Sequence, residues 1–153
     1  MSSKYIHYGS ANFNKAFFMP ISNRYFFNKP VGGLWASPII SDSGWKEWCK
    51  SNNYRLNRLS EHFIFTLKPD VNVLVIQSNA ALTMLDFMGY CIDYSKKYDL
   101  PLRPNEYYLD FEKLLSDGYD AVQVFINNET YWSMYGWDCD SILILNPDCI
   151  ILD

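Results

Sequence analysis

The chain has 153 residues, a length typical of one domain, with 49% apolar and only 20% charged side chains. This composition is far from the low hydrophobicity and high charge of disordered chains, so we expect a single folded domain over residues 1–153. The net charge is −4 and no cluster of Lys and Arg stands out, which disfavours nucleic-acid binding without excluding it. The sequence shows no signal-peptide stretch and no run of about 18 apolar residues, so we expect a cytoplasmic protein with no membrane partner.

The four cysteines bear on compartment and on metal binding. Cys49, Cys91, Cys139 and Cys149 show neither C-x-x-C spacing nor the density of a secreted disulfide scaffold. We therefore expect free thiols in a reducing compartment. No Cys/His metal spacing occurs in the sequence, so no metal cofactor is expected, and the motifs of zinc proteases, P-loop proteins and serine hydrolases do not occur either.

The first half of the chain alternates short regular segments with irregular sequence. Residues 4–8 favour a first strand, whereas residues 9–37 are rich in Asn, Pro, Gly and Phe and show neither helical nor strand periodicity. We predict a long loop there, and loops of such length in compact domains are often functional. Residues 43–49 favour a helical turn with Ser43 as its N-cap.

The second half predicts strands and two main helices. Apolar residues recur at helical spacing between residue 80 and about residue 98, which predicts a helix there. A second helix is expected over residues 106–116, with Gly118 at the place where a helix C-terminus favours glycine. Strands are expected at residues 61–67, 71–77, 120–126, 141–145 and 149–152. This order of strands and helices is typical of an α+β domain.

Two short motifs near the N-terminus combine residue types that suit a binding site. The first, His7-Tyr8-Gly9-Ser10, puts a histidine at a strand end beside a glycine that allows a ligand to approach the backbone. The second, Gly33-Leu34-Trp35-Ala36-Ser37, places a large aromatic and a hydroxyl residue after a glycine. A lone histidine at a strand end is more often structural than functional, so the interpretation depends on the order of the motifs along the chain.

Together these motifs resemble those of the ADP-ribosyltransferase superfamily, in which a first strand carries His or Arg followed by a small residue. A second strand of that family carries an aromatic residue followed closely by Ser or Thr. The resemblance implies an ADP-ribosyltransferase-like split β-sheet core with two main helices, and NAD as the substrate that is bound. It also implies that His7 contacts the ribose next to adenine, that Trp35 stacks on nicotinamide and that Ser37 supports the site. Tyr8, Gly9 and Ser10 complete the first NAD-binding motif.

The third family motif is an acidic residue at the head of a late strand, often with a second polar or acidic residue two positions earlier. Asp138 and Asp140 precede the apolar segment 141–145 and resemble this pattern. The i, i+2 spacing puts both carboxylates on one face if the segment is extended. The resemblance therefore implies Asp140 as the catalytic acid and Asp138 as its partner, with Asp standing where the family usually has Glu.

The chemistry of NAD cleavage explains why these residue types are needed. Breaking the bond between nicotinamide and ribose builds positive charge on the sugar, so a nearby carboxylate stabilises the transition state more than the ground state. An arginine can pair with the pyrophosphate through two hydrogen bonds. Arg24 lies between the first two motifs and is the candidate for this role from its position.

The sequence leaves three functions open. The leading hypothesis is a mono-ADP-ribosyltransferase that moves ADP-ribose from NAD to a macromolecule, with a protein favoured over a nucleic acid as acceptor. A bacterial or phage toxin or effector would fit this reading, and it would have an antitoxin or inhibitor as a further partner. The alternatives are an NAD glycohydrolase, with water as acceptor, and a non-catalytic binding or interaction protein on the same scaffold.

Overall fold

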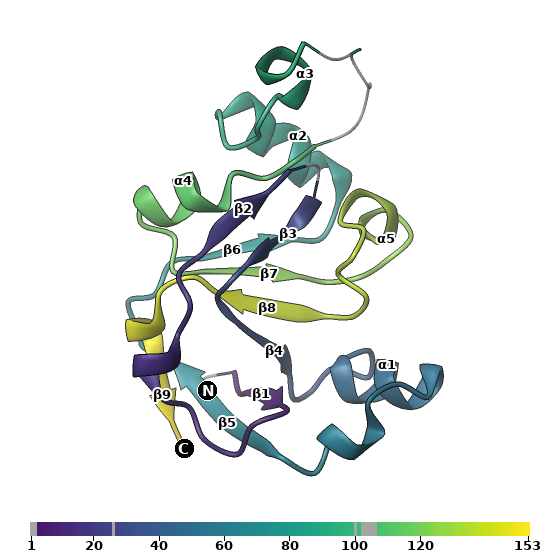
Figure 1. Cartoon of the computed structure of the whole chain (residues 1–153), viewed down its shortest axis with the longest axis vertical. Helices are drawn as coiled ribbons and strands as arrows, with labels where there is room; N and C mark the ends of the chain where they lie inside the picture. Colours follow the sequence, from purple (N-terminus) through teal and green to yellow (C-terminus); the bar gives the residue numbers. More distant parts are fainter. Residues whose placement is uncertain (1–2, 26, 100, 102–106) are drawn as a thin grey trace.

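A seven-stranded mixed sheet runs through the molecule (Figure 1). The computed structural model describes residues 3–25, 27–99, 101 and 107–153. The strand order is β6-β7-β8-β4-β1-β5-β9, in which β6 and β7 are parallel and the other neighbours are antiparallel. The strands of this sheet are β1 (Tyr5–Tyr8), β4 (Leu34–Pro38), β5 (His62–Leu67), β6 (Val73–Ile76), β7 (Ala121–Val124), β8 (Ser141–Ile144) and β9 (Ile150–Leu152). A separate two-stranded sheet consists of β2 (Ser22–Arg24) and β3 (Phe27–Val31).

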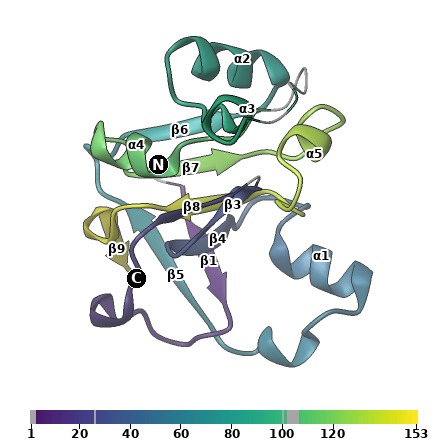
Figure 2. The ribbon, with the colours of Figure 1, turned by 45° about the horizontal axis from the view of Figure 1, so that its top comes forward.

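The helices are short and lie around the sheet rather than in one layer (Figures 1 and 2). The α-helices of the described residues are α1 (Trp45–Asn52), α2 (Asn79–Phe87), α3 (Tyr94–Lys97), α4 (Phe111–Ser116) and α5 (Thr130–Ser133). Three 3₁₀ turns, at Lys15–Phe17, Leu56–Arg58 and Pro147–Cys149, complete the regular structure of these residues. Figure 1 places α2 and α3 beyond β6 and places α1 beside β4. The chain is therefore a mixed α+β fold, as the sequence predicts.

The central strands β7 and β8 are mostly apolar, each with one buried polar residue, Gln123 in β7 and Ser141 in β8. Every residue of β7 and of β8 is buried, because each of these strands has a neighbour on both sides and side chains packed on both faces. The parallel β6–β7 pair requires a crossover connection, and the segment with α2, α3 and α4 supplies it. The strands expected at residues 71–77, 120–126 and 141–145 are thus confirmed, with slightly shorter bounds.

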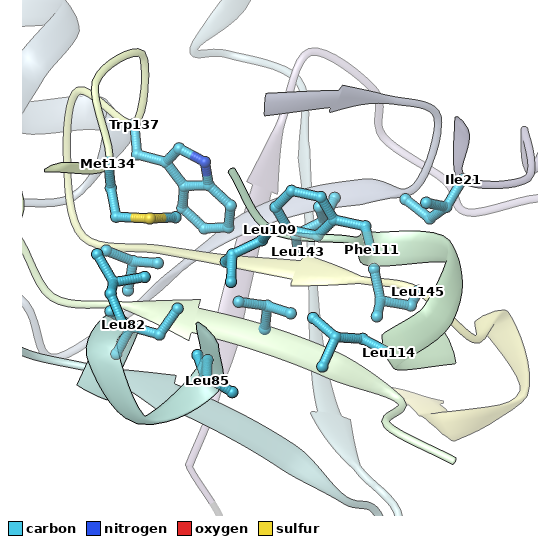
Figure 3. Close-up of a cluster of buried hydrophobic side chains, with 13 residues drawn as sticks. Ile21, Leu82, Leu85, Leu109, Phe111, Leu114, Met134, Trp137, Leu143 and Leu145 are labelled. Atoms are coloured by element: carbon cyan, nitrogen blue, oxygen red, sulfur yellow. The ribbon is translucent and has the colours of Figure 1, made fainter. Parts of the chain in front are cut away.

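The larger core cluster fills the space between these helices and the central strands (Figure 3). Leu82 and Leu85 of α2 enter it from one side, and Phe111 and Leu114 of α4 enter it from another. Trp137 closes the cluster with only 2% of its surface exposed. Burying side chains of this size stabilises a fold by about 1.5–3 kcal/mol each, so this cluster supplies much of the free energy of folding.

The segment 9–37 is not the long loop that its composition predicts, because it contains β2, β3 and most of β4. The strand β3 carries Asn28 and Pro30 and so lacks the apolar alternation that identifies strands in a sequence. Asn28 is buried, with its amide donating to the carbonyl oxygens of Tyr107 (2.6 Å) and Ser133 (3.0 Å). Its Oδ1 accepts a hydrogen bond from the Leu109 amide at 2.7 Å. Because both the amide nitrogen and Oδ1 of Asn28 are hydrogen-bonded, this polar side chain can occupy a buried position that an apolar side chain would fill in other strands.

The helix predicted from residue 80 to about residue 98 is two shorter helices. The first, α2, ends at Phe87. Gly89 then adopts a φ of +88°, a left-handed conformation that ends the helix and that glycine adopts without steric strain. Asp93 begins α3 by accepting hydrogen bonds from the amides of Ser95 and Lys96. The apolar spacing continues through the break, and for this reason periodicity alone overestimates the length.

The bounds of two other predicted helices also change. The helix predicted over residues 106–116 begins at Phe111 in the structure, where Asp110 caps it through the Lys113 amide; residues 102–106 lie outside the described residues. Gly118 ends this segment with a φ of +101°, as expected. The N-cap of α1 is Gly44 rather than Ser43. Within the described part of the chain, no helix is long and apolar enough to cross a membrane.

We expect Gly32→Ala to destabilise the fold more than Gly118→Ala. Both glycines have a positive φ, so both substitutions should cost about 1–2 kcal/mol of backbone strain. A Cβ at Gly32 would also overlap the backbone oxygen of Pro20, whereas a Cβ at Gly118 would meet no atom within 4 Å. Urea denaturation should show an additional loss of about 1–3 kcal/mol in the free energy of unfolding for Gly32→Ala. Equal losses in the two variants would show that the tight β3–β4 turn is not constrained as described.

Candidate functional site

The site lies where two neighbouring strands of the main sheet separate. The strands β1 and β4 pair only through Tyr5 with Pro38 and Ile6 with Ser37, although each continues beyond these residues. On its other side, β1 pairs with β5 along its whole length. The sheet therefore opens between β1 and β4, and a pocket of about 400 Å³ lies at this opening.

Most residues of the three sequence motifs come together in this pocket. Its lining contains the motif residues His7, Tyr8, Gly9, Trp35, Ser37 and Asp138. Three residues that the sequence analysis assigned to the site, Ser10, Arg24 and Asp140, are not part of the lining. The strands that carry or follow the motifs are neighbours in the order β8-β4-β1, and this adjacency brings distant residues together.

His7 bridges the opening. Its Nδ1 donates a hydrogen bond to the Trp35 carbonyl oxygen at 2.6 Å, since a carbonyl can only accept. The ring also lies against Phe63, with 5.0 Å between ring centroids. Burial lowers the pKa of His7 below its usual 6.5, and the hydrogen bond to Trp35 only partly opposes this. The imidazole is therefore neutral at pH 7, with the proton on Nδ1 and with Nε2 as a hydrogen-bond acceptor.

Trp35 is half-buried and held by two neighbours. Its ring meets the Trp137 ring edge to face, with centroids 4.6 Å apart and an angle of 68° between the planes. The Nζ of Lys29 lies 5.3 Å from its centroid, within range of a cation–π interaction. The indole is thus fixed in orientation at the pocket wall, as a stacking surface requires.

Ser37 has a structural task. It is 2% exposed, and its Oγ accepts a hydrogen bond from the Trp45 amide at 3.0 Å. Trp45 is the first residue of α1, and the N-cap residue Gly44 has no side chain that could accept from the first amides of the helix. Ser37 therefore satisfies an amide at the helix start that would otherwise lack a partner, and it joins α1 to β4.

The two acidic residues of the third motif occupy different environments. Asp138 is exposed and lines the pocket, and within the described part of the chain its carboxylate makes no hydrogen bond or ion pair. Asp140 is half-buried, with one oxygen accepting from the Ile126 amide at 2.8 Å and the other from Ser41 Oγ at 2.7 Å. The side chain of Asp140 thus ties β8 to two loops, whereas Asp138 offers a free carboxylate to a ligand.

The other two residues outside the lining belong to local structure. Ser10 Oγ donates to the Asn12 carbonyl at 2.8 Å and so closes a turn after β1. Arg24 ends β2 as an exposed residue, and its backbone oxygen accepts from the Tyr94 hydroxyl at 2.9 Å. Position along the chain suggested Arg24 for the pyrophosphate, but the fold carries β2 away from the opening and into its own small sheet.

Lys29, Arg55 and Arg58 provide the positive charge of the lining, and Asp138 provides the negative charge. Arg58 Nη2 donates to the Gly9 carbonyl at 3.1 Å, and Lys29 lies over Trp35, so both cations are in contact with motif residues. Sequence reasoning missed these cations because they come from β3 and from the segment after α1, which show no motif. The pocket is therefore locally positive in a chain of net charge −4.

Metal ligands and thiols are the remaining reactive groups to place at the site. Among the described residues, no group of three or more His, Cys, Asp or Glu side chains could hold a metal ion. All four cysteines are free, and Cys139 lines the pocket. Burial raises the pKa of the Cys139 thiol to about 11, so it stays protonated and unreactive at neutral pH.

Comparison with protein-family models, with curated proteins and with solved structures found no match for this chain. The geometry and chemistry of the pocket are therefore what indicates a function.

We expect the His7 imidazole to titrate below pH 6.5 and to be the Nδ1–H tautomer at pH 7. Because the unfolded chain takes up this proton at a higher pH than the folded chain, the stability that depends on neutral His7 is lost as the pH falls from about 6.5 through the folded pKa. Nitrogen chemical shifts of the imidazole, assigned with a His62→Gln variant, measure both properties. An Nε2–H tautomer at pH 7 would contradict the hydrogen bond to Trp35.

Proposed function

We propose that the chain binds NAD in this pocket and transfers its ADP-ribose to a macromolecular acceptor, as an ADP-ribosyltransferase does. One observation carries the proposal: residues from all three motifs, with His7 and Trp35 28 residues apart and Trp35 and Asp138 103 apart, line one pocket. Short-motif matches carry a false-positive risk, and a shared pocket is the structural context that favours this resemblance over chance matches. The opening between β1 and β4 further supports a split-sheet core of the ADP-ribosyltransferase type.

The pocket has the size of a small-molecule site and carries groups that suit parts of NAD. Its volume of about 400 Å³ falls in the range of small-molecule sites, about 300–1,000 Å³. The Trp35 ring offers a face on which nicotinamide stacks, and neutral His7 offers a hydrogen-bond acceptor for a ribose hydroxyl. Lys29 and Arg58 supply positive charge for the diphosphate, a role for which the sequence suggested Arg24.

We assign the charge-stabilising role to Asp138 instead of Asp140. In the transfer, the bond between C1′ of the ribose and the nicotinamide nitrogen breaks, and its electron pair leaves with nicotinamide. A nucleophilic atom of the acceptor then forms a bond to C1′ and releases its proton to solvent. The free carboxylate of Asp138 lies at the pocket and can stabilise the positive ribose, whereas both oxygens of Asp140 are already engaged.

Incubation with NAD tests the function and separates its alternatives. The protein is mixed with NAD labelled in the adenine and with cell extract, and nicotinamide, ADP-ribose and labelled macromolecules are then measured. Label on a macromolecule supports the transferase. Free ADP-ribose alone would identify an NAD glycohydrolase, and NAD that is bound but not consumed would identify a non-catalytic binding protein. Absence of both binding and turnover would refute the proposal.

Asp138→Asn should lower the rate of NAD consumption by about a hundredfold to a thousandfold with little change in NAD affinity, because the charge acts mainly in the transition state. Its stability should equal that of the parent, since the Asp138 side chain is exposed. Asp140→Asn is the matched control. It should lose about 1–3 kcal/mol of stability, because a carboxylate that accepts two hydrogen bonds is replaced, and it should keep most of its turnover. A reversed pattern would restore Asp140 as the acid.

Trp35→Ala should weaken NAD binding, because a stacked ring acts in the ground state as well as in the transition state. Trp35→Phe retains an aromatic face and should recover a large part of the affinity. Isothermal titration with NAD measures both variants beside the parent. Equal affinity in the parent and in Trp35→Ala would remove Trp35 from the nicotinamide site.

A further inference from the structure

One wall of the pocket is an aromatic cluster that the three motifs do not explain. The rings of Trp45 and Trp48, one turn apart on α1, are stacked with 5.1 Å between centroids and 10° between planes. Tyr54 packs edge-on against both, at 6.0 Å and 5.5 Å. The guanidinium of Arg55 lies 5.1 Å from the centre of the Tyr54 ring. We call Trp45, Trp48, Tyr54 and Arg55 the aromatic–arginine cluster.

The cluster is accessible from solvent and continuous with the pocket. Trp45, Tyr54 and Arg55 line the pocket, Tyr54 is 39% exposed, and Trp48 is half-buried. An isolated hydrophobic core would bury these rings. Here the rings stay partly open to solvent beside the pocket, and Figure 2 shows α1, which carries the two tryptophans, at the edge of the molecule.

The backbone around the cluster is strained in order to place these side chains. Asn53 and Arg55 both have left-handed backbones, with φ of 50° and 46°, and neither is a glycine. Such residues each cost free energy that the surrounding structure must supply, and they concentrate at functional sites. Here they turn the chain after α1 so that Tyr54 returns to the tryptophans and Arg55 covers its ring.

Positive charge alternates with the rings along the same segment. Between residues 45 and 58 the chain has the four cations Lys46, Lys50, Arg55 and Arg58 and one acidic residue, Glu47, a net charge of +3 in a chain of net charge −4. Several residues separate each cation from the next, so they form no contiguous run in the sequence. In the fold they belong to one helix and the turn that follows it.

We propose that the aromatic–arginine cluster and the cations around it bind single-stranded nucleic acid, so that a nucleic acid is the macromolecular acceptor. Stacking on aromatic rings and on arginine is how proteins hold unpaired bases, and Lys and Arg beside the rings pair with the phosphates. A duplex keeps its bases stacked inside and offers no free face to Tyr54. Trp, Tyr and Arg are enriched at protein interfaces as well, but lysines such as Lys46 and Lys50 are depleted there, so the mixture of rings and lysines favours a nucleic acid. Only the acceptor role rests on the proposed function; the binding itself does not require NAD.

Fluorescence anisotropy tests the binding without NAD. The probes are fluorescein-labelled 12-nucleotide DNA and RNA of mixed sequence, with a labelled poly-glutamate peptide of equal length as an anion that has no bases. Either nucleic acid should bind more tightly than the peptide, with log K falling by about 2–3 per tenfold increase in salt if the four cations contact phosphates. Tighter binding of the peptide would identify an acidic protein segment as the partner and overturn the proposal.

Variants locate the binding on the cluster. Trp48→Ala should lose at least about fivefold in affinity if a base stacks there. Phe87→Ala, which removes an aromatic ring from α2 that is 88% exposed, should lose nothing. Arg55→Gln should reduce the salt slope by about 0.7, and the matched control Lys68→Gln should leave it unchanged. Arg55 is exposed, so its variant remains informative if Trp48→Ala does not fold.

The outcomes distinguish this proposal from the one on which its acceptor role depends. Failure of both nucleic acids to bind, or equal losses of affinity in the cluster variants and their controls, overturns nucleic-acid binding by the aromatic–arginine cluster. Neither result bears on the proposed NAD turnover. Nucleic-acid binding by a protein that neither binds nor consumes NAD would confirm this role of the cluster and refute the proposed transferase.

Discussion

The arrangement of the site depends on how few hydrogen-bonded pairs join β1 to β4. Two residue pairs hold the strands together at one end, and beyond them the His7 imidazole replaces the backbone by donating to the Trp35 carbonyl. A complete antiparallel ladder would close the sheet and leave no room between the motifs. A complete separation would divide the sheet into two and release the tryptophan. The pocket exists because the sheet opens by an amount that one side chain can bridge.

Trp137 connects the pocket to the core and to β3. Trp137 packs edge-on against Trp35, stacks near Phe111 in the core and donates its Nε1 hydrogen to the Asn28 carbonyl at 2.5 Å. Asn28 in turn satisfies backbone groups of three distant residues through its own side chain. Asn28 of β3 therefore joins the Trp137 indole, which lines the pocket, to the backbone around residues 107–109 and 133. This explains why segment 9–37 lacks an apolar pattern at β3: Asn28 is held in the interior by hydrogen bonds, where a core strand would use an apolar side chain.

The sequence predicts some levels of this structure better than others. Strands rich in apolar residues, such as β7 and β8, are identified correctly because their burial on both faces makes most of their residues apolar. The strand β3 leaves no such trace, because Asn28 is buried through hydrogen bonds that depend on residues about 80 and 105 positions away. The shared location of His7 and Trp35 can be inferred from motif order alone. The difference between Asp138 and Asp140 cannot, because it depends on Ser41 and Ile126, which only the fold brings to one of the two carboxylates.

The tryptophans of this chain are unevenly distributed, and this gives the protein an optical property. Of its five tryptophans, Trp35, Trp45 and Trp137 line the pocket, and Trp48 is stacked on Trp45. Only Trp132, on α5 and 73% exposed, stands apart from this group in the contacts described. Four of the five indoles therefore lie at the pocket or stack on a ring that lines it. A molecule that enters the pocket or stacks on the aromatic–arginine cluster changes the surroundings of several of these indoles at once. Intrinsic fluorescence therefore detects such binding without a label.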